Sequence, residues 1–254
     1  MERAGLVALL AGEGFIAAEE EADELLARAA GDADLLDAML QRRLTGEPLA
    51  WITGRVSFCG VEVRVDPGVY VPRWHTELVA ERAAQRLPER GVAIDLCTGS
   101  GAVACVLRAH RPQARVVATD VDARAVACAR ANGVEVHHGD LFDPLPGELH
   151  GRADVVVAVV PYVPANELPL LQRDTFTFES SLAYDGGPDG TDVLLRVAGG
   201  APRYLRPGGA LLLELGGSQA DILRPHLEAL GFTAITVLHD EDGDVRGVEA
   251  TLSG

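Results

Sequence analysis

From residue 92 onward, short apolar segments alternate with segments of helical periodicity. The apolar segments span residues 93–97, 115–120, 134–140, 154–160 and 210–215. Near-continuous apolar strands separated by helices are typical of a parallel sheet covered by helices on both faces. Two further segments, 233–238 and 245–252, flank an acidic turn that contains the pair Asp242-Gly243. Because such a pair favours a hairpin, the last strand should run antiparallel to its neighbours. The sequence therefore predicts an α/β fold with a Rossmann-like, seven-stranded sheet.

The region before residue 76 has a different organisation. Residues 19–30 carry acidic side chains in their first turns, which suits the positive end of a helix dipole. Residues 32–44 place apolar side chains at helical spacing. Residues 56–71 alternate apolar and polar side chains around Gly60, as a β-hairpin does. We therefore divide the chain into an N-terminal helical domain (1–55), a connecting β-hairpin (56–75) and a catalytic domain (76–254).

Charge and composition exclude several classes of protein. The formal net charge is −16, and arginine supplies all 22 positive charges, because the chain contains no lysine. Nucleic-acid binding depends on neutralising phosphates, so the negative charge of this chain disfavours binding to DNA or RNA. The sequence contains no run of eighteen apolar residues, so it predicts no membrane-spanning helix. The N-terminus lacks the basic start and apolar core of a secretion signal, so we expect a cytoplasmic protein.

The four cysteines, at positions 59, 97, 105 and 128, give no sign of a metal site. They form no Cys-x-x-Cys pair, and no histidines follow them at zinc-ligand spacing. We therefore predict neither a disulfide nor a bound metal, and interpret the cysteines as small apolar side chains in a reducing compartment.

The segment DLCTGSGA, Asp95 to Ala102, joins a predicted strand to a predicted helix. Its glycines allow a tight turn and a close approach of the backbone to a ligand. The next strand ends in Asp120, where a carboxylate can accept hydrogen bonds from both hydroxyls of a ribose. The third strand ends in Gly139-Asp140-Leu141, which places another carboxylate near an adenine amino group. The pattern predicts a site for an adenosine-containing ligand.

The sequence of this loop is compatible with binding a dinucleotide, with binding S-adenosylmethionine and with a purely structural role. Gly99, Gly101 and Ala104 also fit the Gly-x-Gly-x-x-Ala pattern of dinucleotide-binding domains, and a glycine turn can be purely structural. Asp95 favours S-adenosylmethionine, because a carboxylate there can pair with its ammonium group but would repel a pyrophosphate. The residues that we predict to bind this cofactor are Asp95, Thr98, Gly99, Gly101, Asp120, Val121, Asp140 and Leu141.

An ordered series of motifs extends from about Gly46 to the C-terminus: GEPLAWITG (46–54), FCGVEVRVDPGVYVPRWHTE (58–77), DLCTGSGA, GDLF (139–142), PYV (161–163), LAYDGGPDGTDVL (182–194) and LRPGGALLLELG (205–216). In these motifs the chain resembles the protein-(glutamine N5) methyltransferases that modify peptide release factors. The resemblance implies a class I S-adenosylmethionine-dependent methyltransferase fold with a helical substrate-recognition domain at the N-terminus.

The same resemblance locates an acceptor site, and there the chain departs from the family. The family holds the glutamine amide with an Asn-Pro-Pro-Tyr motif after the fourth strand, whereas this chain has Val159-Val160-Pro161-Tyr162. The valine side chain cannot accept a hydrogen bond, and an amide donor buried beside it would be unsatisfied at a cost of about 1–3 kcal/mol. The Val160 carbonyl and the Tyr162 ring keep their family positions and are predicted to contact the acceptor.

Two further residues complete the predicted acceptor site. The family pattern Pro-Arg-x-x-Thr-Glu occurs as residues 72–77. Within it, His75 either acts as a proton acceptor at the active site or is a surface residue beside Trp74. Glu179 matches a family glutamate. It belongs to the segment 170–184, which either lines the acceptor pocket or is a solvated loop. The same segment contains Asp174, Phe176 and Phe178.

We therefore expect an S-adenosylmethionine-dependent methyltransferase with an acceptor other than the release-factor glutamine. That acceptor would be a small metabolite, a natural-product intermediate or another protein side chain. The alternatives are a working glutamine methyltransferase with a drifted motif, a related fold that catalyses a different SN2 displacement such as a ring closure, and a non-catalytic subunit. The sequence leaves the oligomeric state and any partner subunit open.

Overall fold

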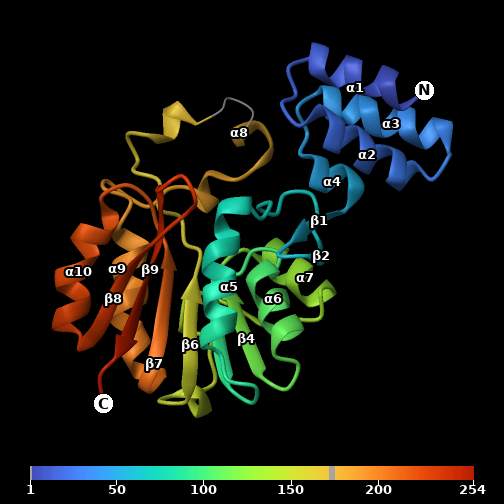
Figure 1. Ribbon diagram of the computed structural model, residues 1–254. Helices are drawn as coiled ribbons and strands as arrows, with labels where there is room; N and C mark the ends of the chain where they lie inside the picture. Colours follow the sequence, from blue (N-terminus) through green and yellow to red (C-terminus); the bar gives the residue numbers. More distant parts are fainter. Residues whose placement is uncertain (1, 172–174) are drawn as a thin grey trace.

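The computed structural model describes residues 2–171 and 175–254, and within them the largest sheet has seven strands in the order β5-β4-β3-β6-β7-β9-β8 (Figure 1). Its strands are β3 (Val92–Leu96), β4 (Arg115–Asp120), β5 (Glu135–His138), β6 (Ala153–Ala158), β7 (Leu205–Glu214), β8 (Phe232–His239) and β9 (Val245–Leu252). Strands β3 to β7 pair in parallel, and β9 pairs antiparallel with both β7 and β8. The predicted fold class and the antiparallel last strand are confirmed.

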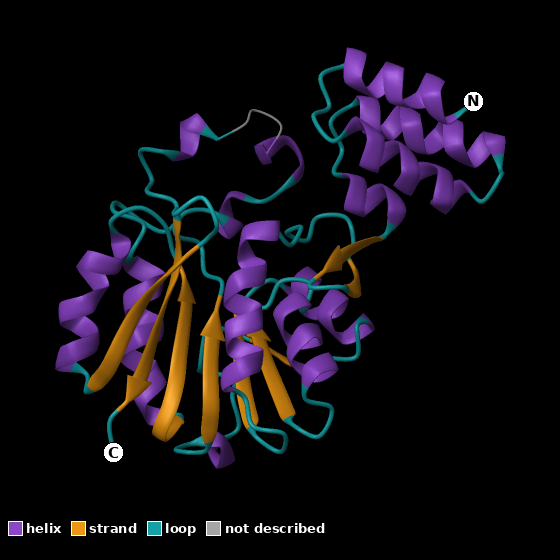
Figure 2. Cartoon of the chain, viewed as in Figure 1, coloured by secondary structure: helices purple, strands orange, loops and turns teal. Residues whose placement is uncertain are grey.

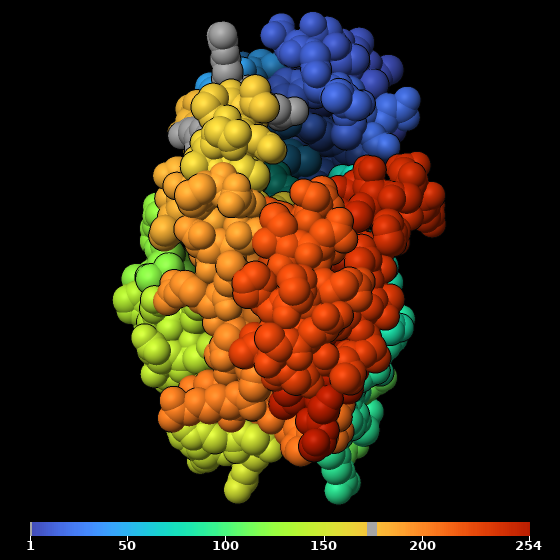
Figure 3. All heavy atoms as spheres, turned by 90° about the vertical axis from the view of Figure 1, so that its left-hand side faces the viewer, coloured from blue at the N-terminus to red at the C-terminus, as the bar shows by residue number. Residues whose placement is uncertain are grey.

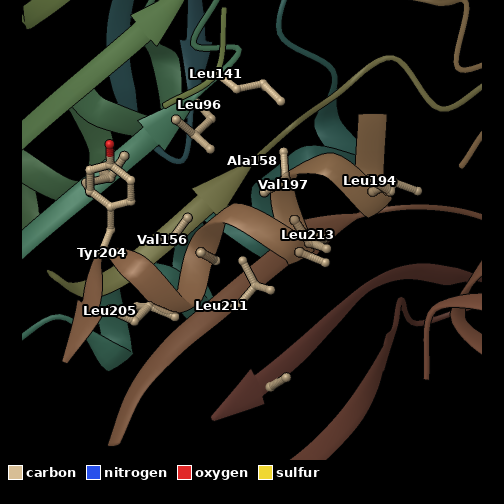
Figure 4. Packing of buried hydrophobic residues seen from close by; sticks show 14 of the residues in the cluster. Leu96, Leu141, Val156, Ala158, Leu194, Val197, Tyr204, Leu205, Leu211 and Leu213 are labelled. Atoms are coloured by element: carbon tan, nitrogen blue, oxygen red, sulfur yellow. The ribbon is translucent and has the colours of Figure 1, made fainter. Parts of the chain in front are cut away.

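Helices cover both faces of this sheet, as the apolar strands predict. The flanking helices are α5 (Glu77–Arg86), α6 (Ala102–His110), α7 (Ala123–Ala131), α9 (Asp192–Gly200) and α10 (Gln219–Ala229). Alternate residues of β6 point to opposite faces: Val155 and Val157 pack with α5, α6 and α7, while Val156 and Ala158 pack with α9 and α10. Figure 4 shows the second of these layers, where residues of α9 cover those of β6 and of its neighbour β7.

The N-terminal helices form a separate apolar cluster. They are α1 (Arg3–Gly12), α2 (Ala18–Ala29) and α3 (Ala33–Leu44), and their buried residues include Leu6, Leu25 and Leu40. Strands β1 (Arg55–Phe58) and β2 (Val61–Arg64) then form the expected antiparallel hairpin. Figure 1 shows these helices set apart from the large sheet. The exact domain boundaries at 55 and 75 stay predictions.

A short helix joins these two parts of the chain and has no counterpart among the expected elements. Helix α4 (Leu49–Thr53) buries Trp51, whose Nε1 donates a hydrogen bond of 2.9 Å to the carbonyl of Val69. The remaining short elements are α8 (Thr175–Phe178) and the 3-10 helices η1 (Trp74–Thr76), η2 (Gly147–Leu149), η3 (Leu168–Leu170), η4 (Ser181–Ala183) and η5 (Ala201–Arg203). The indole hydrogen bond ties α4 to the connector that leads into η1.

Several global features bear on function. In the described part of the chain, no helix combines the length and apolarity needed to cross a bilayer. The four cysteines are free thiols. Across residues 2–171 and 175–254 no cluster of His, Cys, Asp and Glu side chains has the form of a metal site. Figure 3 shows the end of the β8–β9 hairpin (red) projecting at the same end of the molecule as the N-terminal helices (blue).

Replacing Asp32 with alanine should destabilise the N-terminal helices. The Asp32 carboxylate accepts hydrogen bonds of 3.0 Å from the backbone N–H groups of Asp34 and Leu35 and so caps α3. We expect Asp32→Ala to lower the free energy of unfolding by about 1 kcal/mol in urea denaturation. Asp37→Ala, an exposed change on the same helix, is the control and should have little effect. Equal effects of the two changes would contradict the capping role.

Candidate active site

A large cavity lies at the carboxyl ends of the parallel strands, where the loops gather (Figure 2). The chain runs outward from β3 to β4 and β5 and then returns to β6 on the other side of β3, which opens a crevice at this edge. The cavity has a volume of about 640 Å³ and is lined from the ends of β3, β4, β6 and β7, from residues 68–76 and from residues 180–184. It is therefore the candidate active site.

The glycine loop between β3 and α6 forms one end of this cavity. Its Cys97, Gly99 and Gly101 have φ values of +55°, +58° and +85°, all in the left-handed region. A Cβ at Gly99 would meet open space, whereas a Cβ at Gly101 would lie 3.0 Å from a methyl of Val134 and 3.2 Å from Ala129. Gly99 thus leaves room for a ligand. Gly101 permits the close packing behind the loop, and its predicted contact with a cofactor stays a prediction.

The carboxylate of Asp95 is buried beneath this loop with one oxygen unused. Its Oδ2 accepts hydrogen bonds from Thr98 Oγ1 at 2.6 Å and from Ala104 N at 3.2 Å. Its Oδ1 has no hydrogen-bond partner among the described residues. Burial raises the pKa of Asp95 to about 7, against the opposing effect of these hydrogen bonds. An oxygen of this kind suits a ligand that brings an ammonium group, as S-adenosylmethionine does.

Asp120, for which a ribose contact is predicted, lines the cavity at the end of β4. Its Oδ2 accepts a hydrogen bond of 2.8 Å from Gly99 N, and its Oδ1 accepts one of 2.9 Å from Asp122 N. Burial raises the pKa of this carboxyl, which lines the cavity. Each carboxylate oxygen has two lone pairs, so both retain capacity for a ligand hydroxyl after these backbone bonds.

The remaining predicted cofactor residues line the same end of the cavity. Val121 is 53 % exposed, and Leu141 is buried with a φ of +46°. Asp140 forms an ion pair of 2.6 Å with Arg196, and its carboxylate is half exposed. The unused Asp95 oxygen, the open space over Gly99 and the spare capacity of Asp120 together fit the chemistry of S-adenosylmethionine.

The valine-containing segment after β6 lines the middle of the cavity. Val159, Val160 and Tyr162 all contribute to its wall. The Tyr162 carbonyl accepts a hydrogen bond of 2.7 Å from the Gln219 side chain, and a Cβ at Gly190 would lie only 2.1 Å from that carbonyl. Close packing and this amide therefore fix the segment. Burial, followed by the nearby Glu214 carboxylate, raises the pKa of the Tyr162 phenol above its usual range.

Glu214 is a cavity residue that the motifs did not identify. It is the last residue of β7, its side chain is 1 % exposed, and both carboxylate oxygens lack hydrogen-bond partners among the described residues. The predicted residue His75 lies beside it, with Nε2 3.5 Å from Glu214 Oε1. The available signal was one glutamate at the end of an otherwise apolar strand, in the sequence ALLLEL.

Glu179 lies behind the cavity wall, where its carboxylate already has protein partners. It accepts hydrogen bonds from the backbone N–H of Val71, from the Arg73 guanidinium and from the Tyr184 hydroxyl. These contacts connect two cavity-lining segments, because Arg73 and Tyr184 do line the cavity. The expected contact of Glu179 with an acceptor stays a prediction.

The segment around Glu179 contributes to the cavity only in part. Its described cavity-lining residues are Leu171, Ser180, Leu182, Ala183 and Tyr184. Phe178 instead packs edge-to-face on Trp51 of α4, with 6.2 Å between ring centroids. Asp174 and the side chain of Phe176 lie outside the described residues.

Comparisons with known proteins point to methyltransferases. A family model described as "Methyltransferase small domain" matches residues 61–162. The release factor glutamine methyltransferase of Geobacter sulfurreducens is 36 % identical over 211 residues, which cover 81 % of this chain and 73 % of the relative. The enzyme of the same name from Neisseria gonorrhoeae is 39 % identical over 232 residues, which cover 89 % and 81 %.

Two solved structures share the fold. The E. cuniculi Mtq2-Trm112 complex, described as methylating the termination factor eRF1, has a TM-score of 0.53 at 23 % identity and covers 73 % of this chain and 99 % of that one. The T. thermophilus 16S rRNA methyltransferase RsmC, in complex with AdoMet and guanosine, has a TM-score of 0.52 at 20 % identity and covers 79 % and 44 %. At these identities the likeness supports the fold alone.

Affinity for S-adenosylhomocysteine should rise with pH until Asp95 is ionised. Because the pKa of Asp95 is about 7, the carboxyl is largely protonated at a lower pH and must release a proton to pair with a ligand ammonium. We expect calorimetric titration to show affinity rising through neutral pH and levelling above it. Asp95→Asn should lose about 1.5–3 kcal/mol of binding free energy and most of this pH dependence. Wild-type affinity that is constant across this range would contradict the assignment.

Proposed function

Because this chain belongs to the release factor glutamine methyltransferase family and is an S-adenosylmethionine-dependent methyltransferase, we propose that it methylates an acceptor other than the release-factor glutamine. The acceptor would be a small metabolite, a natural-product intermediate or a different protein side chain. The observation that carries this proposal is the apolar side chain of Val159 in the wall of the cavity.

A glutamine amide needs a hydrogen-bond acceptor at this position. The amide nitrogen is a poor nucleophile because its lone pair is delocalised into the carbonyl, so the enzyme has to orient it closely. Alignment of reacting groups contributes several kcal/mol to such a transfer. The methyl groups of Val159 cannot accept an amide hydrogen, and the unsatisfied donor would cost about 1–3 kcal/mol. An acceptor that is oriented by other contacts avoids this cost.

Different residues of this chain would bind the donor, orient the acceptor and limit the access of water. Asp95, Asp120 and Asp140 would hold the amino-acid and adenosine parts of the donor, which supplies an electrophilic methyl group on a positively charged sulfur. Val160 and Tyr162 would orient the acceptor, with Gln219 holding the Tyr162 backbone in place. The Arg73–Glu179–Tyr184 contacts would keep the 180–184 segment over the cavity and limit the access of water.

The rival function is methylation of the release-factor glutamine itself. The names of the relatives from Geobacter sulfurreducens and Neisseria gonorrhoeae favour it, at 36 % and 39 % identity. On this alternative, the Val160 carbonyl and Tyr162 would suffice to hold the amide despite Val159. The two candidates make opposite predictions for the wild-type protein when a release factor is supplied.

Restoring the amide-binding residues should confer release-factor methylation. We expect the wild-type protein to methylate the release-factor glutamine only at a low background rate, and Val159→Asn with Val160→Pro to methylate it faster. The gain in kcat/KM should be about 5- to 150-fold over the wild-type background, because one unsatisfied donor costs about 1–3 kcal/mol. Mass spectrometry of the glutamine-containing peptide would detect the added methyl group.

A control at the other end of the cavity tests the position of this effect. Val121→Asn introduces the same amide into the cavity wall beside Asp120 and should give no such gain. Titration with S-adenosylhomocysteine should show unchanged affinity in the double variant. Efficient methylation of the glutamine by the wild-type protein would overturn the proposal and favour the rival, and failure of the wild type to bind either S-adenosyl compound would contradict both.

A further inference from the structure

The carboxylate of Glu214 differs from the other buried carboxylates of the chain. Glu249 on β9, which is also buried, pairs with Arg82 at 2.7 Å and Arg86 at 3.4 Å. Glu214 is 1 % exposed, and neither of its oxygens has a hydrogen bond of regular geometry within the described residues, although the Tyr162 hydroxyl is close enough to interact with it. A buried charge without compensation is costly, so proteins rarely retain one without a partner. Because Glu214 lines the cavity, its partner can be a ligand.

The groups around Glu214 leave its negative charge largely uncompensated. Among the described residues, His75 is the one basic side chain within 4.0 Å of it, with Nε2 3.5 Å from Oε1. Burial and the Glu214 charge both raise the pKa of the Tyr70 phenol, to about 12, and that of the Tyr162 phenol. Both phenols therefore stay neutral near pH 7 and cannot take a proton. The nearby Arg73 is already paired with Glu179.

The sheet places Glu214 at the far end of the cavity from the donor site. Strands β3, β6 and β7 are adjacent, and Asp95 is level with Leu212, two residues before Glu214. With neighbouring strands about 4.8 Å apart and a rise of about 3.3 Å per residue, Glu214 is roughly 12 Å from Asp95. Val159 and Val160 follow β6, the strand between them. The cavity thus has acidic groups at both ends and an apolar wall in the middle. An acceptor that binds between these ends can place its polar group beside Glu214 and His75 while that group faces the donor, with its apolar part against the valine wall.

We propose that Glu214 and His75 bind a primary amine as the methyl acceptor and take its proton. This inference rests on the proposed function, in which the acceptor is not the release-factor glutamine. The amine enters as an ammonium ion, which compensates the Glu214 charge and donates hydrogen bonds to its free oxygens. An ammonium nitrogen has no lone pair, so it has to lose a proton before it can react.

The proton and the electron pairs of this reaction move only between the amine, His75, the methyl donor and solvent. The ammonium ion gives one proton to the imidazole of His75, and the resulting imidazolium pairs with the Glu214 carboxylate. The freed lone pair of the nitrogen forms a bond to the methyl carbon as the carbon–sulfur bond breaks, and the electron pair of that bond stays on the sulfur. The product is a methylated ammonium ion, and the His75 proton passes to solvent. Positioned proton acceptors of this kind contribute about 10²- to 10⁴-fold to rate.

A neutral amide suits this end of the cavity less well than an amine. An amide can donate hydrogen bonds to Glu214, but it leaves a net negative charge buried at the site. Its nitrogen releases a proton only as the new bond forms, so an amide does not need a proton acceptor that works before the attack. A purely structural Glu214–His75 ion pair is the competing interpretation, and it predicts that loss of the Glu214 charge destabilises the protein.

The test uses a matched pair of simple acceptors with the full-length protein and S-adenosylmethionine. Pentylamine and pentanamide have chains of the same length and differ in the nitrogen group. We expect formation of N-methylpentylamine, with kcat/KM at least about 100-fold above that for the amide. Glu214→Gln should lower kcat/KM for the amine by about 100-fold or more, mainly through KM, and His75→Gln should act mainly on kcat.

Glu249→Gln is the matched control, since it makes the same change at a buried glutamate outside the cavity. It should lower the melting temperature by removing two arginine contacts and leave the amine kinetics unchanged. Glu214→Gln should keep or raise the melting temperature, because it removes an uncompensated charge. Affinity for S-adenosylhomocysteine should be unchanged in all three variants.

Several outcomes would overturn the amine assignment. They are preference for the amide, absence of amine-dependent methyl transfer at high millimolar pentylamine, and amine kinetics that Glu214→Gln leaves unchanged. A fall in melting temperature for Glu214→Gln as large as that for Glu249→Gln would favour the structural ion pair. Methylation of the release-factor glutamine by the wild type would instead overturn the proposed function. If the wild type methylates neither release factor nor amine, the amine assignment alone fails.

Discussion

The parallel pairing of β3 with β4 and with β6 brings the functional side chains of this protein together. Because these strands run in the same direction, their carboxyl ends meet at one edge of the sheet, and the return of the chain from β5 to β6 opens a crevice there. Asp95 lies near the end of β3, Asp120 ends β4, the two valines follow β6, and Glu214 ends β7. Side chains more than a hundred residues apart in the sequence thereby line one cavity. The helices on both faces bury the strands and hold this edge in register.

Burial of carboxylates follows two patterns in this fold, and the difference separates structure from function. Glu179 and Glu249 are buried with their oxygens occupied by arginines and other protein donors, so they connect segments of the protein. Asp95 and Glu214 are buried at the cavity with one or both oxygens unused. Unsatisfied buried polar groups are expensive, which makes them informative about missing ligands. The chain keeps one such carboxylate at each end of the cavity, with an apolar wall between them.

The fold and the donor end of the site were predictable because their signals are local. Strand length, helical periodicity and the Asp-Gly turn indicated the seven strands and the antiparallel last one, and a glycine loop followed by Asp120 indicated an adenosine site. Other features depended on contacts between distant segments. Helix α4 exists because Trp51 is buried against the connector, and the lack of a Cβ at Gly101 matters because of Ala129 and Val134. Glu179 matched a family position, but its contacts with Arg73 and Tyr184 could not be read from spacing.

The sequence by itself determined the class of fold, the family resemblance and the substitution of Val159 at the position of an amide-binding asparagine. These properties depend on residue type and order along the chain, which a pattern records directly. The tertiary structure alone decided which carboxylates are satisfied and which face the cavity. It placed His75, from the segment before α5, beside Glu214 at the end of β7. Hydrogen-bond satisfaction is a property of distances between segments, so only the packed chain could identify Glu214 as a free, buried carboxylate.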